Sequence, residues 1–213
     1  MRRTPLLALA LAALSAFAGA GPALAAAGPA PARGHDLVDV AARIPDALVE
    51  LRYATPRNFL GRAVYPAGAR CLLRAPVADR LARAAARLRP DGLRLRLWDC
   101  FRPVAVQREM WRLVPRPGYV ADPAKGSNHN RGAAVDVGLA GADGAEVPVP
   151  TDFDTFSPRA HARAAGLPEA AARNRDRLRA AMEAEGFRVN RMEWWHFDAP
   201  EARGAPLLDA ELR

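Results

Sequence analysis

One stretch, SNHNRGAAVD at residues 127–136, constrains this chain more than any other. It places a histidine, His129, and an aspartate, Asp136, on either side of an Arg-Gly turn. Proline, glycine and asparagine punctuate residues 115–131, which predicts a loop, whereas the following AAVDVGL segment is typical of a strand. We therefore expect His129 late in a loop and Asp136 in a strand, so that a flexible element is anchored to a rigid one.

A second stretch, EWWH at residues 193–196, supplies the groups that the first one lacks. A catalytic zinc ion takes three protein ligands and keeps a fourth position for water. We predict one Zn²⁺ per chain, bound by His129, Asp136 and His196, with Glu193 as the general base that takes a proton from the zinc-bound water. Residues three apart on a regular strand point to opposite faces, so this prediction requires a bulge or a strand end at EWWH.

Hydrophobic periodicity places the other elements. Apolar residues recur at helical spacing over 76–89 and 169–185, and Pro103 opens a further helix that extends to about residue 114. Leucine alternates with Arg94, Arg96 and Trp98 in a half-buried strand, and a final strand is expected from Phe187 to about Asp198. Strands and helices without regular βαβ alternation predict an α+β fold with a central antiparallel sheet flanked by helices, and with the zinc site at the sheet.

The motif SxHxxGxAxD followed by ExWH resembles the zinc D-Ala-D-Ala metallopeptidases. Three further segments, YATPRNFLGR at 53–62, LWDCFRP at 97–103 and the Phe153-Asp154 pair, make the chain most similar to the VanX-type D-alanyl-D-alanine dipeptidases. The similarity covers roughly residues 36–200. It implies the D-Ala-D-Ala metallopeptidase or hedgehog-like fold, and hydrolysis of the dipeptide D-Ala-D-Ala to two D-alanines.

The resemblance also suggests roles for residues outside the two zinc motifs. Arg102 matches the arginine that faces the substrate carbonyl in this family, where a fixed cation would stabilise the oxyanion; the alternative is an ion pair with Asp99 or a neighbouring carboxylate. Tyr53, Ser127 and Asp154 correspond to positions that line the dipeptide site. A free dipeptide carries an ammonium at one end, with which Asp154 can pair.

The amino terminus is typical of a secretory signal, with Arg2 and Arg3 before an apolar core at 6–18 and a small-residue cleavage site at 23–25. The core is shorter than the about 20 apolar residues that span a bilayer. We expect an exported protein, periplasmic or secreted, without stable membrane association after cleavage; an uncleaved anchor is the alternative. The predicted organisation is a signal peptide (1–25), a linker (26–35) and one catalytic domain (36–213).

Export changes how the two cysteines are interpreted. Cys71 and Cys100 would lie in an oxidising compartment, where a disulfide is permitted and closing this loop would add about 3–4 kcal/mol of stability. Neither cysteine has metal-ligand spacing. Two separate buried thiols remain the alternative, since two cysteines fix no distance.

Charge and motif content separate the remaining function classes. The formal charge is +8, but the basic residues are scattered, which indicates a solvated surface and no nucleic-acid partner. His35 and His161 lack partner motifs and are interpreted as surface or structural. A zinc D,D-carboxypeptidase or endopeptidase acting on peptidoglycan peptides is the first rival, and the YATPRNF block and Asp154 argue against it. A non-catalytic zinc-binding module is the second, and it would need neither Glu193 nor Arg102.

Overall fold

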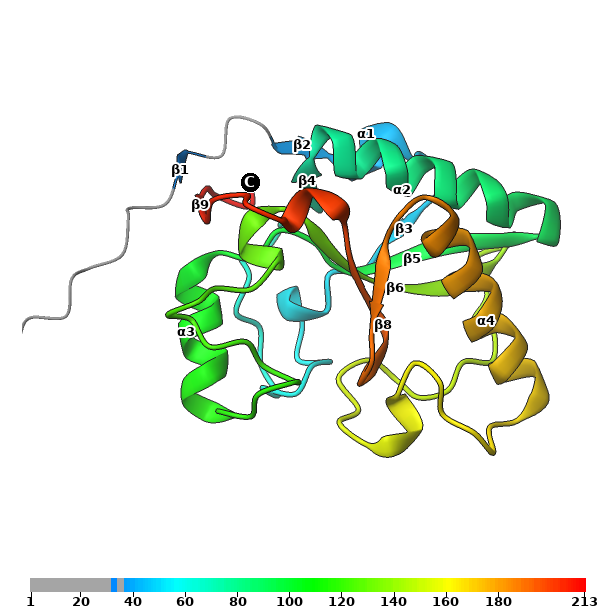
Figure 1. Cartoon of the computed structure of the whole chain (residues 1–213). Coiled ribbons are helices and arrows are strands. Elements are labelled where there is room, and N and C mark those ends of the chain that lie inside the picture. Colours follow the sequence, from blue (N-terminus) through cyan, green and yellow to red (C-terminus); the bar gives the residue numbers. More distant parts are fainter. Residues whose placement is uncertain (1–31, 34–36) are drawn as a thin grey trace, which may run out of the picture.

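The computed structural model describes residues 32–33 and 37–213 (Figure 1). The predicted signal peptide, most of the predicted linker and His35 lie outside the described residues. The helices are α1 (Val40–Arg43), α2 (Ala75–Leu88), α3 (Val104–Leu113) and α4 (Glu169–Ala184), with 3₁₀ turns η1 (Arg52–Ala54), η2 (Arg89–Asp91), η3 (His129–Arg131), η4 (Pro158–Ala160) and η5 (Pro200–Ala202). The strands are β1 (Ala32–Arg33), β2 (Leu37–Asp39), β3 (Leu48–Val49), β4 (Leu72–Arg74), β5 (Leu93–Asp99), β6 (Ala134–Gly141), β7 (Arg188–Asn190), β8 (Glu193–Asp198) and β9 (Leu208–Asp209).

A five-stranded sheet in the order β3-β5-β6-β8-β7 forms the centre of this α+β fold. The strands from β5 to β7 pair antiparallel, whereas the edge strand β3 runs parallel to β5. A parallel pair needs a crossover, and the chain between β3 and β5 includes β4 and α2. The predicted antiparallel sheet is therefore found everywhere except at this edge. Two short ladders, β2 with β4 and β1 with β9, lie outside the sheet.

The predicted helices form close to their expected bounds. In α2 all the predicted apolar positions are buried, namely Val77, Leu81, Ala84, Ala85 and Leu88. α4 ends just before Gly186, whose φ of 85° suits glycine at a helix end. α2 and α4 contact each other as well as strands of the sheet, and Figure 1 shows α3 standing apart from both.

The expected final strand from Phe187 to Asp198 is wrong, because the structure has the hairpin β7–β8 there. The side chain of Asn190 accepts a hydrogen bond of 3.0 Å from the backbone N–H of Met192. Asparagine favours this kind of local turn, which reverses the chain between the two strands.

Strand β5 was expected to be half-buried, but both of its faces are covered. Arg96 and Trp98, on the face expected to meet solvent, are 7% and 4% exposed. The Trp98 ring packs on Phe153 and Trp194. Gly138 on the neighbouring strand leaves room for this ring, since a Cβ there would lie 2.4 Å from a Trp98 ring carbon. The aromatic side chains thus bury this face of the sheet and belong to the same hydrophobic core as the rest of the fold.

The two cysteines form a disulfide between the residue before β4 and the residue after β5. The Cα atoms of Cys71 and Cys100 lie 5.2 Å apart, and Phe101 donates a backbone hydrogen bond of 2.8 Å to Leu72 beside them. The alternative of two separate thiols is therefore wrong. Among the helices that the structure describes, none has the length and apolar character needed to cross a membrane.

Candidate active site

Three side chains from separate elements converge where β6 and β8 lie side by side. His129 begins η3 at the end of the long loop, while Asp136 on β6 and His196 on β8 are direct partners in the ladder. Nδ1 of His196 lies 2.9 Å from Oδ1 of Asp136 and 3.1 Å from Nε2 of His129. The same Oδ1 lies 3.3 Å from Nε2 of His129. Two imidazole nitrogens and a carboxylate oxygen this close are able to hold a metal ion.

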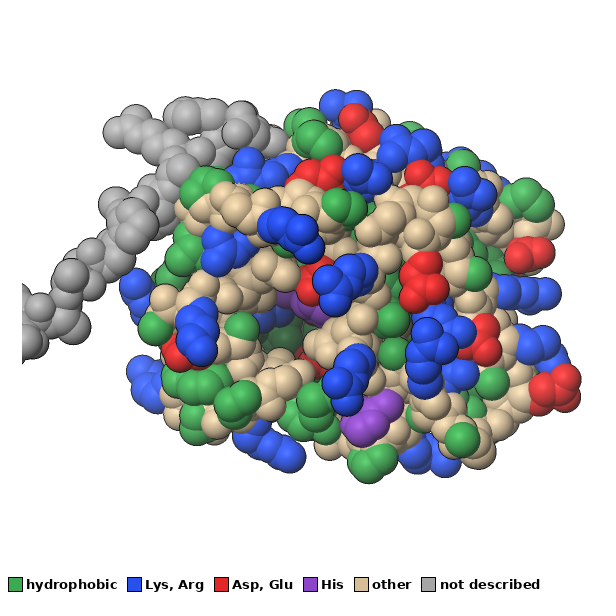
Figure 2. All heavy atoms as spheres, in the orientation of Figure 1, with side chains coloured by type: hydrophobic (Ala, Val, Ile, Leu, Met, Phe, Trp, Pro, Cys, Tyr) green, Lys and Arg blue, Asp and Glu red, His purple; other side chains and the backbone are tan. Residues whose placement is uncertain are grey.

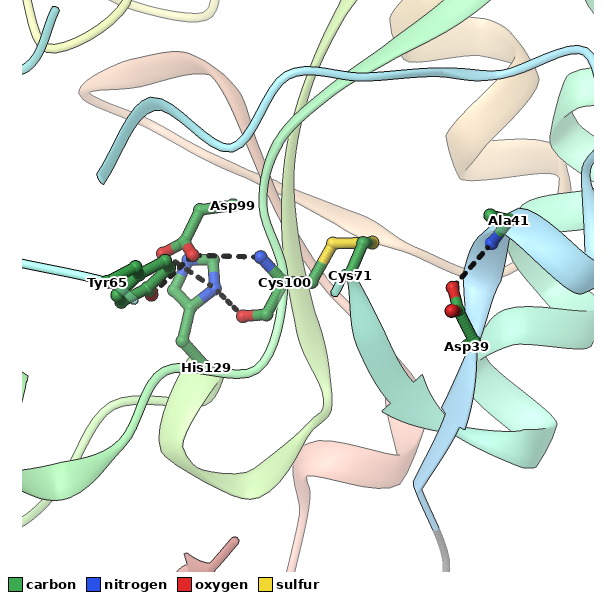
Figure 3. The surroundings of a disulfide bond; sticks show 7 residues. All are labelled: Asp39, Ala41, Tyr65, Cys71, Asp99, Cys100 and His129. Carbon is green, nitrogen blue, oxygen red and sulfur yellow. Dashed lines mark hydrogen bonds and ion pairs between the residues drawn. A yellow bond between two sulfur atoms is a disulfide. The ribbon is translucent and has the colours of Figure 1, made fainter. Parts of the chain in front are cut away.

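The other ring nitrogen of each histidine meets an acceptor outside this cluster. Nδ1 of His129 lies 2.8 Å from the carbonyl oxygen of Cys100, and Nε2 of His196 lies 3.0 Å from Oδ1 of Asp198. An N–H that donates to each acceptor fixes the tautomer and leaves the inward nitrogen with a free lone pair. Figure 3 shows His129 against Cys100, whose disulfide to Cys71 fixes the backbone that presents this carbonyl.

Charge within the cluster suits a cation. Burial alone would raise the pKa of Asp136, but the charges and hydrogen bonds of His129 and His196 outweigh it and hold that pKa below its usual range. Burial would lower the pKa of His196, yet hydrogen bonds from its ring to Asp136 and Asp198 raise it well above its ordinary value. At neutral pH these shifts favour an ionised Asp136 and a proton on His196, and a bound metal ion would displace that proton from Nδ1.

Glu193 and His196 reach one cavity because β8 is irregular. Glu193 is the first residue of the strand, and the pairing with β7 shifts between Val189↔Phe197 and Asn190↔Glu193. This bulge meets the condition that the sequence imposed on EWWH, since a regular strand would point residues three apart to opposite faces.

The Glu193 carboxylate stands beside the three-ligand cluster without joining it. Its Oε2 lies 4.0 Å from Nδ1 of His196 and accepts a hydrogen bond of 3.0 Å from the Asn190 amide. Only 6% of Glu193 is exposed, and burial raises its pKa to about 8 against the opposing charge of His196. A carboxyl whose pKa lies near neutrality is suited to accept and then release a proton.

Arg102 is buried at the same cavity and is held firmly. Its Nε and Nη2 donate to Oδ2 of Asp99 at 3.0 and 2.6 Å, and its Nη1 donates to Gln107 at 2.9 Å. The ion pair with Asp99, expected as an alternative role, therefore exists. Nη2 also lies 3.9 Å from Oδ2 of Asp136, and the guanidinium lies over the Tyr53 ring. Arg102 can thus keep its ion pair with Asp99 and still lie beside the three candidate metal ligands.

Asp154 lines the same cavity and occupies a strained backbone position. Among the described residues other than glycine, it alone has a positive φ, 58°. Its carboxylate accepts hydrogen bonds of 3.1 Å from the Tyr53 hydroxyl and from the Phe59 backbone N–H. Burial is the main cause that raises the pKa of Asp154 to about 7.

Ser127 shapes the loop that presents His129. Its hydroxyl accepts from the His129 backbone N–H at 3.2 Å, and its own N–H donates to the Asn130 side chain at 2.7 Å. The Asn130 amide in turn donates to the Arg102 carbonyl at 2.7 Å. Ser127 also lines the cavity, so a structural role and a place beside a ligand coincide.

All eight predicted site residues line one cavity with a volume of about 250 Å³. They are Tyr53, Arg102, Ser127, His129, Asp136, Asp154, Glu193 and His196. Aromatic side chains complete the wall: Phe59, Tyr119, Phe156 and Trp195. Figure 2 shows a hollow near the middle of the surface that faces the viewer, with histidine, acidic and basic side chains around the opening. His161 is not among the lining residues.

The sequence motifs did not reveal the residues that support the site. Asp99 binds Arg102 and accepts a 2.6 Å hydrogen bond from Tyr65, and Asp198 orients His196. Asn190 and Asn130 hold Glu193 and the His129 loop. Asp99 was expected as a possible ion-pair partner of Arg102, whereas the only sequence signal for Asp198 is that it is an acidic residue two positions from His196.

Comparison with known proteins gives the family. The sequence pattern of the D-ala-D-ala dipeptidase family of peptidases matches residues 33–211. The chain belongs to this family of metallopeptidases. The D-alanyl-D-alanine dipeptidase of Escherichia coli (strain K12) is 40% identical over 81% of this chain and 89% of its own length. The D-alanyl-D-alanine dipeptidases of Enterococcus faecium and Streptomyces coelicolor (strain ATCC BAA-471 / A3(2) / M145) are each 32% identical, over 70% and 71% of the chain and 83% and 85% of their own lengths.

Proposed function

We propose that this metallopeptidase hydrolyses D-Ala-D-Ala to two D-alanines with one zinc ion held by His129, Asp136 and His196. The observation that carries the proposal is the convergence of the three ligand atoms beside Glu193 and Arg102 in a small cavity. Two neutral imidazoles and one carboxylate are a ligand set that zinc accepts. The Cys100 carbonyl and the Asp198 carboxylate bind the outward ring nitrogens, so the inward nitrogens of His129 and His196 are available to the ion.

A zinc ion there would polarise the substrate carbonyl and lower the pKa of a water molecule to about 7. Glu193, buried beside the three candidate ligands, would serve as the general base and acid that accepts a proton from the attacking water and releases it to the leaving amine. Arg102 faces the oxygen on which negative charge develops, and its bonds to Asp99 and Gln107 hold the guanidinium in place before the reaction.

Asp154 gives the site its preference for a free dipeptide. Its carboxylate, fixed by Tyr53 and Phe59, pairs with the substrate ammonium inside a largely buried wall. An acylated or lengthened peptide has no ammonium there and would leave the carboxylate without a partner, which costs several kcal/mol. The small cavity adds a steric limit.

The test is a comparison of kcat/KM for D-Ala-D-Ala, N-acetyl-D-Ala-D-Ala, a D-Ala-D-Ala-ending tripeptide and L-Ala-L-Ala. We expect cleavage of the first and little of the other three. Equal kcat/KM for the free and acetylated dipeptides would favour a D,D-carboxypeptidase or endopeptidase. Binding of zinc without any hydrolysis would favour the non-catalytic module.

We also propose that the enzyme is exported and that residues 1–25 are removed. The charged start, apolar core and small-residue cleavage site support this, as does a disulfide, which persists in oxidising compartments. Amino-terminal sequencing of the protein from the periplasm or medium tests it; an intact leader on cytosolic protein would contradict it.

A further inference from the structure

The turn between β7 and β8 places the Asn190 side chain between the backbone and the Glu193 carboxylate. Oδ1 of Asn190 accepts a hydrogen bond of 3.0 Å from the Met192 N–H, and Nδ2 donates one of 3.0 Å to Oε2 of Glu193. In an amide the oxygen accepts and the nitrogen donates, so the two bonds together fix which way the side chain faces. A local turn of this kind thus aims one N–H at the proposed base.

The Asn190 amide is the one hydrogen-bond donor to the Glu193 carboxylate in the part of the chain that the structure describes. The oxygen that accepts from it, Oε2, also lies 4.0 Å from Nδ1 of the candidate ligand His196. Glu193 is 6% exposed and has little contact with water. Removing the amide would therefore leave a buried carboxylate in need of a new partner.

Glu193 has the chemistry of a metal ligand as well as that of a base. Carboxylate oxygens bind zinc, and ligand atoms about 2.0–2.1 Å from a tetrahedral ion are about 3.3 Å apart. At 4.0 Å from Nδ1 of His196, Oε2 of Glu193 stands just outside that separation. It does not belong to the group of three side chains close enough together to share an ion. A carboxylate that joined them would take the position that the attacking water needs.

We propose that Asn190 is a positioning residue that keeps Glu193 out of the coordination sphere of the metal. This role rests on the proposed zinc site and goes beyond it, because it assigns the separation between base and ligands to a single amide. With Oε2 held by Asn190, Glu193 stays beside the ion as a proton acceptor. Without the amide, the buried carboxylate is drawn to the ion, and rotation of the Glu193 side chain would bring an oxygen onto it.

Two roles for Asn190 predict opposite changes in zinc affinity. If Asn190 only shaped the turn, its loss would loosen β8, and with it His196, and zinc binding would weaken. If Asn190 restrains Glu193, its loss adds a carboxylate ligand, so zinc binds more tightly while turnover falls. A damaged turn does not produce tighter binding together with lower activity.

The test compares the parent with Asn190→Ser by zinc competition titration and by kcat for D-Ala-D-Ala. Serine keeps an oxygen for the Met192 N–H but is too short to reach Glu193. We expect zinc to bind about tenfold more tightly, since an added carboxylate strengthens a cation site, and kcat to fall by about 10²-fold with loss of the base. The visible absorption spectrum of the cobalt-loaded protein should change as well, because it reports the ligands and their geometry. Asn190→Ala, which also lacks the donor, should behave in the same way.

The Glu193→Ala background decides whether the carboxylate causes the change. Asn190→Ser combined with Glu193→Ala should bind zinc as Glu193→Ala alone does, because no carboxylate is left to move. Met192→Ala is the matched control in the same turn. Its side chain lies against Gly118, and its loss leaves the bond between Asn190 and Glu193 in place, so we expect parental zinc affinity and a parental cobalt spectrum. Thermal unfolding of the metal-free proteins identifies the variants that fold.

Unchanged or weaker zinc binding in a folded Asn190→Ser protein would overturn the proposal. So would tighter binding that persists in the Glu193→Ala background, since it would arise from another group. Zinc binding without hydrolysis by the parent would count against the proposed reaction alone, because the titrations judge Asn190 independently of turnover. A parent that binds no zinc would overturn the proposed ligands and the role of Asn190 together.

Discussion

From the hydrogen bond between His196 and Asp198 we predict how strongly the proposed metal site depends on Asp198. Asp198 holds Nε2 of His196 at 3.0 Å and thereby directs the Nδ1 lone pair toward His129 and Asp136. In Asp198→Ala the ring can take the other tautomer or rotate, and either change removes a ligand from the inward position. Loss of such a supporting acceptor typically weakens metal affinity about 10- to 100-fold.

This change in affinity corresponds to about 1.4–2.7 kcal/mol. Because a metal that binds only the folded state stabilises it, the same free energy should appear as a lower unfolding temperature when free zinc is held above both dissociation constants. Asp198→Asn keeps an acceptor oxygen and removes the charge, so it should fall between the parent and Asp198→Ala. Asp209→Ala is a control in which an exposed aspartate that does not line the cavity is lost.

The assay is a zinc competition titration against a chromophoric chelator at pH 7.5, on protein stripped of metal. Equal zinc dissociation constants for Asp198→Ala and the parent would refute the orienting role of Asp198. If Asp209→Ala weakened zinc binding as much, the loss of affinity would not be specific to the Asp198 carboxylate that accepts from His196.

Two further predictions concern stability and pH. Reducing the Cys71–Cys100 disulfide, or replacing both cysteines by serine, should lower the free energy of unfolding in urea by about 3–4 kcal/mol. It should also weaken zinc binding, because Cys100 presents the carbonyl that orients His129. Unchanged zinc affinity would contradict this link between the disulfide and His129. The pKa of Asp154 is about 7, so its carboxyl is neutral below that pH and ionised above it. The KM for D-Ala-D-Ala should fall as pH rises from about 6 toward 8, where the substrate ammonium begins to lose its proton. Asp154→Asn should remove this pH dependence of KM, whereas the control Asp143→Asn should keep it. An unchanged pH dependence in Asp154→Asn would count against pairing of Asp154 with the substrate ammonium.

The sequence predicts well what short motifs and local periodicity determine. The apolar spacing of α2 and the glycine after α4 act within one or two turns, so both helices form where expected. The SNHNRGAAVD and EWWH motifs bring their residues together because each is short and each adjoins a strand of the same sheet. The need for a bulge at EWWH follows from strand geometry alone, and the structure has one.

What the sequence does not reveal depends on contacts between distant segments. Arg96 alternates with leucine like a solvated charge, but in the fold it is buried and binds Glu50 and the Gly144 carbonyl, which lie far from it in the sequence. The hairpin at 187–198 lacks glycine or proline at its turn, and its signal is the single Asn190. The disulfide likewise required two cysteines 29 residues apart to meet, which their spacing does not fix.

We propose that Glu193 moves protons beside a metal ion that other residues hold. Zinc content and turnover of D-Ala-D-Ala, measured on the same preparation of Glu193→Ala, test it most directly. We expect about one zinc per chain, as in the parent, and kcat reduced by about 10²- to 10⁴-fold, the usual contribution of a general acid–base group. Loss of zinc together with activity would make Glu193 a ligand or a structural residue, and full activity with zinc retained would show that another group carries the proton.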